Sequence, residues 1–340
     1  MFAPDLRFPE FKEVWEANVL CDLAPSISSG RDKPAVGSIT LFGSTGPIGT
    51  TAFASYKNEI VLVARVGANA GHLQIVDRPC GVTDNALVLD AKDMNRYVYY
   101  YLLHYNLNKL VFGSGQPLIT GSMLKRIKIF WGTKAERDKI VQLLFLVDKR
   151  IETQSRAIEK LQSLMIEIAK NLTVHTPNTK ISDCLICHNS ILQESQVAEF
   201  GTYPVYGANG VCGYTDTPSI NEDSVLIVKD GSGVGKVSYA TGKFSVVGTS
   251  NYLTAKEGYS LKYLYYCLMC FNFIPYKTGM AIPHIYFKDY GKAKIYCPSF
   301  EEQEKTAKAL SKIETKIEIE QSLLEQFSLQ KQFLLQKMFI

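Results

Sequence analysis

The 340-residue chain contains an internal repeat, and this repeat limits the folds open to it more than any other feature. The stretch 42–49 (FGSTGPIG) matches 206–213 (YGANGVCG), and the three glycines of each stretch coincide. At the same offset, 64–71 (ARVGANAG) matches 228–235 (VKDGSGVG). An ordered series of matching blocks predicts two homologous modules that follow one another along the chain.

The match continues after these glycine loops. Asn85 falls on Asn251, and the tyrosine-rich stretch YVYYYLL that begins at Tyr97 falls on YLYYCLM at Tyr263. We also align FGSGQPLIT (112–120) with YKTGMAIPH (276–284), which places Met280 opposite Gln116, and KIFWGTKAE with KIYCPSFEE. The repeat therefore covers most of the chain.

Each module ends in apolar residues at heptad spacing, which predicts a pair of long helices packed as a coiled coil. Each stripe carries one polar residue at the same place, Gln154 and Glu320. About 39 residues at 1.5 Å each give a helix of roughly 58 Å. This length favours paired helices over two amphipathic helices that each lie on their own domain. The predicted contact residues are Leu144, Val147, Ile151, Ile158, Leu161, Leu310, Ile313, Ile317, Leu324 and Phe327.

Within the modules, short β-branched runs such as EIVLVARV, DNALVLD and SVLIVKD predict strands, and the tyrosine-rich stretches predict helices. The expected fold class is α/β (α+β), with two globular domains joined by two long antiparallel helices and related by an approximate twofold. The expected boundaries are residues 1–133 for module 1, 134–173 for its helix, 174–299 for module 2 and 300–340 for the second helix.

Composition adds few limits. The 37 Lys and Arg against 33 Asp and Glu give a net charge of +4, which permits an anionic partner but is no strong electrostatic signal. The N-terminus lacks a secretory signal pattern, and no apolar run approaches the roughly 20 residues that span a bilayer. We therefore expect a cytoplasmic protein whose 8 cysteines are mostly reduced.

The order of the motifs resembles that of the specificity subunits of type I restriction-modification systems, over nearly the whole chain. The shared series is a Tyr-Gly-x-x-Gly-x-x-Gly loop, an Arg/Lys-x-Gly loop, a Gly-Ser-Gly-Gln segment, a Glu-rich helix start and a heptad helix. The recognition subunits of type IIB enzymes are a close relative.

The resemblance implies a non-catalytic subunit with two target-recognition domains, each of which reads half of an interrupted DNA sequence. The two helices would set the length of the unread gap and would bind methyltransferase subunits, expected to be two, and through them a restriction subunit. No cofactor is expected in this chain, because S-adenosylmethionine, Mg²⁺ and ATP would bind to those partners.

The loops contain residue types suited to contacts with double-stranded DNA. Cations neutralise phosphates, and short polar side chains can read base edges. The glycines could also let backbone N–H groups approach phosphates. The predicted DNA-binding residues are Lys33, Ser44, Thr45, Arg65, Asn69 and Gln116 in module 1, and Asn209, Lys229, Ser232, Lys236, Lys277 and His284 in module 2.

Other motifs are rejected. The segment 230–236 (DGSGVGK) has the wrong spacing for a P-loop. CLICH (184–188) and CLMC (267–270) could suggest haem or zinc, but their counterparts in module 1 lack the same residues. Two alternative functions stay open: a two-headed scaffold for proteins whose glycine loops only form hairpins, and an enzyme with an unrecognised site.

Overall fold

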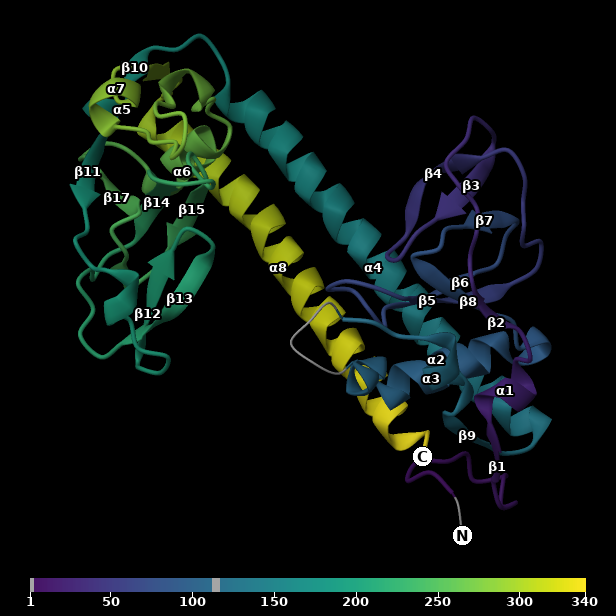
Figure 1. Ribbon diagram of the computed structural model, residues 1–340. Coiled ribbons are helices and arrows are strands. Elements are labelled where there is room, and N and C mark those ends of the chain that lie inside the picture. The colour runs from purple at the N-terminus through teal and green to yellow at the C-terminus, as the bar shows by residue number, and fades with distance from the viewer. Residues whose placement is uncertain (1–2, 112–116) are drawn as a thin grey trace. The chain divides into compact units, whose positions relative to one another are not determined.

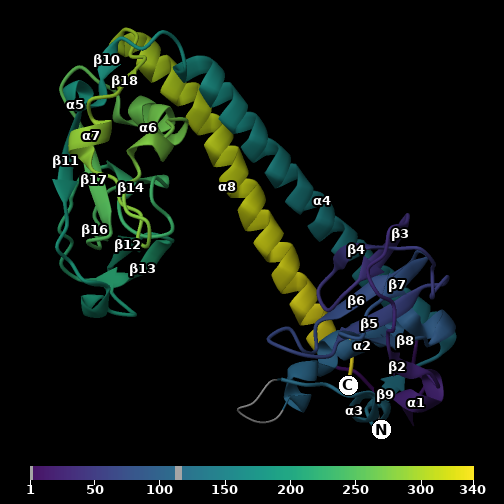
Figure 2. The same cartoon turned by 45° about the horizontal axis from the view of Figure 1, so that its top comes forward.

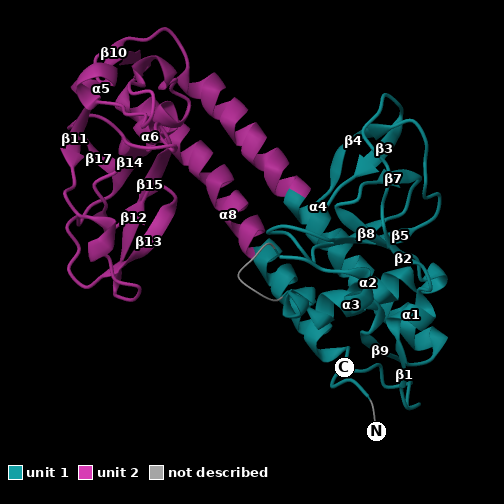
Figure 3. Cartoon of the chain, viewed as in Figure 1, with its two compact units in different colours: residues 1–155, 323–340 teal, residues 156–322 magenta. Residues whose placement is uncertain are grey.

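The computed structural model describes residues 3–111 and 117–340 (Figure 1), which separate into two compact units (Figure 3). Unit 1 comprises residues 1–155 and 323–340, and unit 2 comprises residues 156–322. Each unit thus holds one module together with parts of both long helices. Together they mix helices with antiparallel and parallel strand pairs, which confirms the expected fold class.

The described residues of module 1 form three small sheets. The four-stranded sheet has the order β2-β8-β5-β6, the three-stranded sheet the order β4-β3-β7, and a ribbon pairs β1 with β9. The strands are β1 (Glu16–Val19), β2 (Ile27–Ser29), β3 (Ile39–Phe42), β4 (Pro47–Thr51), β5 (Ile60–Ala64), β6 (Leu73–Val76), β7 (Cys80–Val82), β8 (Ala86–Leu89) and β9 (Lys128–Trp131). The helices are α1 (Leu20–Leu23), α2 (Asn95–Tyr105), α3 (Gly121–Lys125) and α4 (Lys134–Thr173).

Module 2 repeats this arrangement strand for strand. Figure 2 labels the strands and helices of this module. Its sheets have the orders β11-β17-β14-β15 and β13-β12-β16, and its ribbon pairs β10 with β18. The strands are β10 (Thr179–Lys180), β11 (Leu185–Asn189), β12 (Tyr203–Gly207), β13 (Gly210–Thr215), β14 (Ser224–Val228), β15 (Val237–Ala240), β16 (Ser245–Val246), β17 (Ser250–Ala255) and β18 (Lys294–Ile295). The helices are α5 (Ile181–Cys184), α6 (Leu261–Met269), α7 (Phe287–Tyr290) and α8 (Phe300–Lys337). The internal repeat is confirmed, because adding nine to each strand number of module 1 gives the sheet order of module 2.

Three of the four central strands of the four-stranded sheets are buried on both faces. Every residue of β5, β8 and β14 is buried, which explains why their sequences are continuous apolar runs without alternation. One face of the unit 1 sheet packs on α2, and Val61 and Val63 join the same core as Tyr97 and Leu102. This rigid layer supports the loops at the ends of the strands.

The tyrosines of α2 and α6 anchor each helix by the same bonds. The hydroxyl of Tyr97 donates to the carbonyl of Phe130 at 2.7 Å, and the hydroxyl of Tyr263 donates to the carbonyl of Tyr296 at 2.8 Å. A ring that fills the core while its hydroxyl satisfies a backbone carbonyl explains why tyrosine recurs in these stretches.

A second set of tyrosine bonds fixes α2 and α6 to the long helices. Tyr100 donates to Asp148 on α4 at 2.9 Å. Tyr266 donates in the same way to Glu314 on α8 at 2.9 Å, and Lys262 adds an ion pair at 2.7 Å. Each module is therefore held to its own long helix by a hydroxyl-to-carboxylate contact.

The long helices pack antiparallel within each unit. In unit 1, Asp148 in the first half of α4 pairs with Lys331 near the end of α8 at 2.6 Å, and Leu144 shares a core with Leu334. In unit 2, His175, just after α4, stacks edge-on against Tyr296, just before α8. The predicted helix-contact residues are all buried or half-buried. The expected twofold between the modules stays a prediction.

Candidate functional site

The first glycine stretch of each module forms a β-hairpin. In module 1, β3 and β4 are joined by a turn in which the N–H of Gly43 donates to the carbonyl of Gly46 at 2.9 Å, so Ser44 and Thr45 occupy the tip. In module 2, β12 and β13 pair Gly207 with Gly210, so the exposed Asn209 lies at the tip. The predicted polar residues of these stretches therefore lie at hairpin turns.

The second glycine loop joins β5 to β6 in module 1 and β14 to β15 in module 2. Gly67 and Gly71 have φ angles of +81° and +91°, and Gly231 and Gly235 have +91° and +88°. These left-handed conformations favour glycine, which explains why the glycines coincide in both modules. Since DGSGVGK connects two strands and opens no helix, it is not a P-loop.

The N–H groups of the four matched glycines in these loops already donate inside the protein. Gly67 donates to the carbonyl of Pro117 at 3.0 Å, and Gly231 donates to the carbonyl of Pro283 at 3.0 Å. Gly71 and Gly235 donate to the carbonyls of the preceding strands. The expectation that glycine N–H groups approach phosphates is therefore wrong for these four glycines, and for the other glycines it stays a prediction.

A third segment pairs with this loop identically in both modules and corrects our alignment. Val66 bridges Leu118, and Asp230 bridges His284. Because Pro117 is hydrogen-bonded as Pro283 is, the prediction that Met280 lies opposite Gln116 is wrong by two residues. The matching sequences are Pro-Leu-Ile at 117–119 and Pro-His-Ile at 283–285. The first of these contains no glycine and no helical periodicity, so its sequence could not have fixed the register. Gln116 itself lies outside the described residues.

Three of the predicted cationic residues lie at the ends of the second glycine loops. Arg65 and Lys229 immediately follow β5 and β14 and are half-buried, whereas Lys236 is exposed at the end of its loop. In the part of the chain that the structure describes, none of the three forms an ion pair. Such cations remain available to an external anion.

The other predicted residues are more dispersed. Asn69 and Ser232 are exposed in the second glycine loops, and Lys277 is exposed where the third segment of module 2 begins. Lys33 is exposed in the β2–β3 loop, beside the three-stranded sheet. In module 1 the hairpin tip is tied to the sheet that carries Asn69, because Gln74 on β6 donates to the carbonyl of Ser44 at 2.9 Å.

Module 2 has a cavity of about 410 Å³ beside its loops, lined by residues that include Lys229, Asp230, Asn251 and Lys288. The Oδ1 atom of Asn251 is buried and has no hydrogen-bond partner among the described residues. Burial raises the pKa of Cys187, which also lines the cavity, to about 11, although the nearby Lys229 opposes this shift. The Cys187 thiol is therefore neutral at pH 7, so it does not form an ion pair with the lysines that line the cavity.

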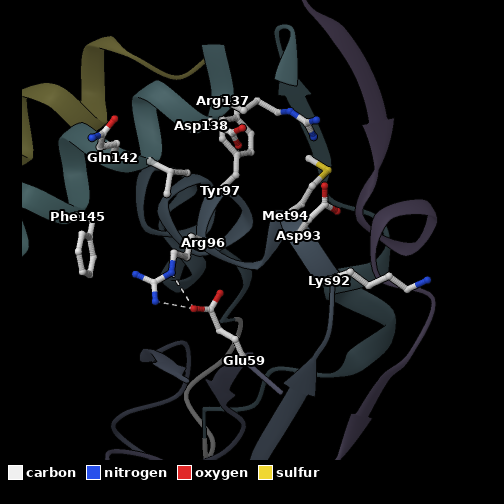
Figure 4. A pocket seen from close by; sticks show the side chains of 11 residues that line it. Glu59, Lys92, Asp93, Met94, Arg96, Tyr97, Arg137, Asp138, Gln142 and Phe145 are labelled. Carbon is white, nitrogen blue, oxygen red and sulfur yellow. Dashed lines mark hydrogen bonds and ion pairs between the residues drawn. The ribbon is translucent and has the colours of Figure 1, made fainter. Parts of the chain in front are cut away.

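A cavity of about 350 Å³ in unit 1 lies between the start of α2 and the first turns of α4 (Figure 4). Arg96 points toward Glu59, with which it forms a hydrogen bond at 2.7 Å, and its guanidinium lies 4.8 Å from the ring centroid of Phe145. This arginine thus joins the end of the sheet to α4. None of the predicted site residues lines this cavity, and we assign it a structural role.

Sequence reasoning missed several polar residues of the site. Gln74 and Lys288 carried no pattern that could have singled them out. The sequence did mark Asp230, because this residue lies between two matched residues, Lys229 and Gly231, at the position that Val66 occupies in module 1. A polar residue that replaces an apolar one within a matched loop was the available signal.

The comparison with a protein-family model decides the identity. The model described as type I restriction modification DNA specificity domain matches the chain twice, at residues 9–163 and 180–328. The chain belongs to this family of type I specificity subunits. The two matches correspond to the two modules and their helices.

Individual relatives agree with this assignment. The specificity subunit is 23% identical over 312 residues to a Mycoplasma genitalium protein named as a type I specificity subunit, covering 79% of this chain and 77% of the relative. It is also 26% identical over 113 residues to the Escherichia coli EcoprrI specificity subunit, covering 33% of this chain and 28% of the relative.

Solved structures share the fold. The crystal structure of a type I restriction-modification S subunit from M. genitalium matches with a TM-score of 0.70 at 19% identity, covering 100% of this chain and 99% of that chain. A chain from a structural study of type I complex assembly and conformational transition matches with a TM-score of 0.55 at 14% identity, with 98% of each chain covered. In the described part of the specificity subunit, no helix is long and apolar enough to cross a membrane.

Proposed function

We propose that this specificity subunit binds an interrupted DNA sequence, reads one half-site with each module and directs adenine methylation and restriction by partner subunits. One observation carries the proposal: the two modules share their loop backbone, including the left-handed glycines, but differ in the side chains that these loops present. Two readers of different half-sites need a common frame with different contact residues.

In this proposal the cations bind phosphates and the short polar side chains read base edges. Arg65, Lys229 and Lys236 are the best placed for phosphates, because they flank the second glycine loops without ion-pair partners in the described chain. Lys33 and Lys277 are further phosphate contacts. The base-reading candidates are Ser44, Thr45, Asn69, Asn209, Ser232 and His284, and Gln116 is retained from its sequence motif.

The subunit itself would carry out no chemistry. The partners would be two methyltransferase subunits, which bring S-adenosylmethionine, and a restriction subunit, which uses Mg²⁺ and ATP, in the cytoplasm. The long helices would bind the methyltransferase subunits. Exposed apolar side chains along them, including Leu146 at 58% and Ile319 at 57% exposure, support a protein-binding surface there.

A genome-wide map of methyladenine tests this function in the native cell, with and without the chain. Loss of methylation at one interrupted motif in the cell without the chain is the expected result. An unchanged map, together with protein partners captured in the absence of DNA, would favour a protein scaffold instead.

A further inference from the structure

The position that bridges the second glycine loop to the third segment differs in chemistry between the modules. In module 1 it holds two apolar side chains, Val66 and Leu118, and Leu118 is 40% exposed. In module 2 the same backbone bridge holds Asp230 and His284. The backbone is thus constant while the contact chemistry changes from apolar to polar.

The imidazole of His284 is held firmly. Its Nδ1 lies 2.6 Å from Oδ1 of Asp230, and its ring lies nearly parallel to that of Tyr286, with an interplanar angle of 24° and ring centroids 6.4 Å apart. The N–H and carbonyl of His284 both bond to Thr278, at 2.7 and 2.9 Å, which closes the loop between them. Gly279 has a φ angle of +88°, and a Cβ atom there would lie 2.4 Å from the carbonyl oxygen of Ile282 and 3.2 Å from Cδ2 of the ring, so this loop conformation favours glycine.

The carboxylate determines which nitrogen of His284 faces outward. A carboxylate only accepts hydrogen bonds, so Nδ1 carries the proton that Asp230 accepts. In the neutral ring, Nε2 is then an acceptor. The His284 side chain is 35% exposed, and its Nε2 has no partner among the described residues.

Resting on the proposed function, we infer that this bridge is a specificity-determining position. In module 2, Nε2 of His284 accepts a hydrogen bond from the exocyclic amino group of adenine or cytosine in the major groove, and Asp230 is the positioning residue that fixes the acceptor. In module 1, Leu118 contacts the C5-methyl group of thymine. Both contacts follow from the groups that base edges present in this groove.

The test compares methyladenine maps and in-vitro methylation for the full chain with its methyltransferase partners. His284→Ala should relax one base pair of one half-site by roughly tenfold and leave the other half-site unchanged, which serves as the internal control. Asp230→Asn should relax the same base pair, because an amide no longer fixes the tautomer. His284→Gln, which keeps an acceptor, should restore the preference.

A base analogue that lacks the exocyclic amino group at this position gives the chemical control. It should reduce methylation by the wild-type complex roughly tenfold and have no further effect on His284→Ala. Leu118→Ala should lose, in the other half-site, the preference for thymine over uracil.

The outcomes separate the inference from the proposed function. If the wild-type chain directs methylation at an interrupted motif but His284→Ala keeps every position of it, only the inference fails. An equal loss of affinity for all sequences would also overturn it, because that result marks a structural role for the pair. If the wild-type chain directs no motif, the proposed function fails and the inference with it.

Discussion

Lysine side chains at the loop ends are expected to bind DNA without reading its sequence. Lys229 follows β14 and has no ion pair in the described chain, so Lys229→Ala should weaken binding to every sequence and lower the salt slope by about one. Titrations of the complex with cognate and unrelated duplexes at several salt concentrations measure both quantities. Lys294→Ala, on the exposed side of β18, is the matched control; equal slopes for both variants would contradict the phosphate contact.

Buried tyrosines make the fold sensitive to alkaline pH. Burial raises the pKa of Tyr101 to about 12, and its hydroxyl donates to the carbonyl of Ile340 at 2.9 Å. Because the unfolded pKa is about 10, this contribution to stability is present below pH 10 and is lost as pH rises toward 12.

The melting temperature measured between pH 8 and pH 12 checks this expectation. It should fall above pH 10 in the wild type and fall less steeply in Tyr101→Phe. The exposed Tyr214→Phe should keep the wild-type slope. A Tyr101→Phe variant with that same slope would show that Tyr101 is not the responsible group.

At the scale of elements, each module depends on one carboxylate of its long helix. Glu314 accepts from Tyr265 and Tyr266 and pairs with Lys262. Glu314→Ala removes the carboxylate partner of the Tyr265 hydroxyl and leaves the Tyr266 hydroxyl with Ser311 alone, and it should lower the free energy of unfolding by about 2 kcal/mol. Thermal and denaturant unfolding measure the change. Lys308→Ala, exposed on the same helix, should stay within about 0.5 kcal/mol of the wild type, and a similarly small effect for Glu314→Ala would refute the anchoring role.

The exposed apolar side chains of the long helices are expected to bind partners. Ile319→Glu places a charge on this surface and should reduce co-purification of the methyltransferase subunit by at least about tenfold, while the melting temperature stays near that of the wild type. The exposed Glu318→Gln serves as the control on the same helix. Undiminished co-purification of Ile319→Glu would place the binding surface elsewhere.

The elements were largely predictable from sequence, because periodicity and repetition are local signals. The heptad stripes, the apolar strands and the tyrosine-rich helices all correspond to observed elements. The pairing of the third segment was not predictable in the same way, since its register depends on backbone bonds from Gly67 and Gly231 to residues about 50 positions away. The Asp230–His284 pair was missed for the same reason.

At the scale of the whole molecule, the duplication gives two modules with one shared fold, as the proposed reading of two half-sites requires. Sheet order, glycine conformations and tyrosine anchors are repeated, whereas Asp230 and His284 replace Val66 and Leu118. Sequence predicted the duplication but not which differences lie at equivalent backbone positions. The length of the long helices as a ruler for the unread gap stays a prediction.

The most direct measurement exchanges residues 178–299 for the corresponding module of another specificity subunit and maps methyladenine across the genome. The expected result is a motif in which one half-site changes while the other half-site and the gap are kept, because in the proposed function each module reads DNA independently. A motif in which both half-sites change, or in which neither changes, would contradict the division of recognition between the two modules.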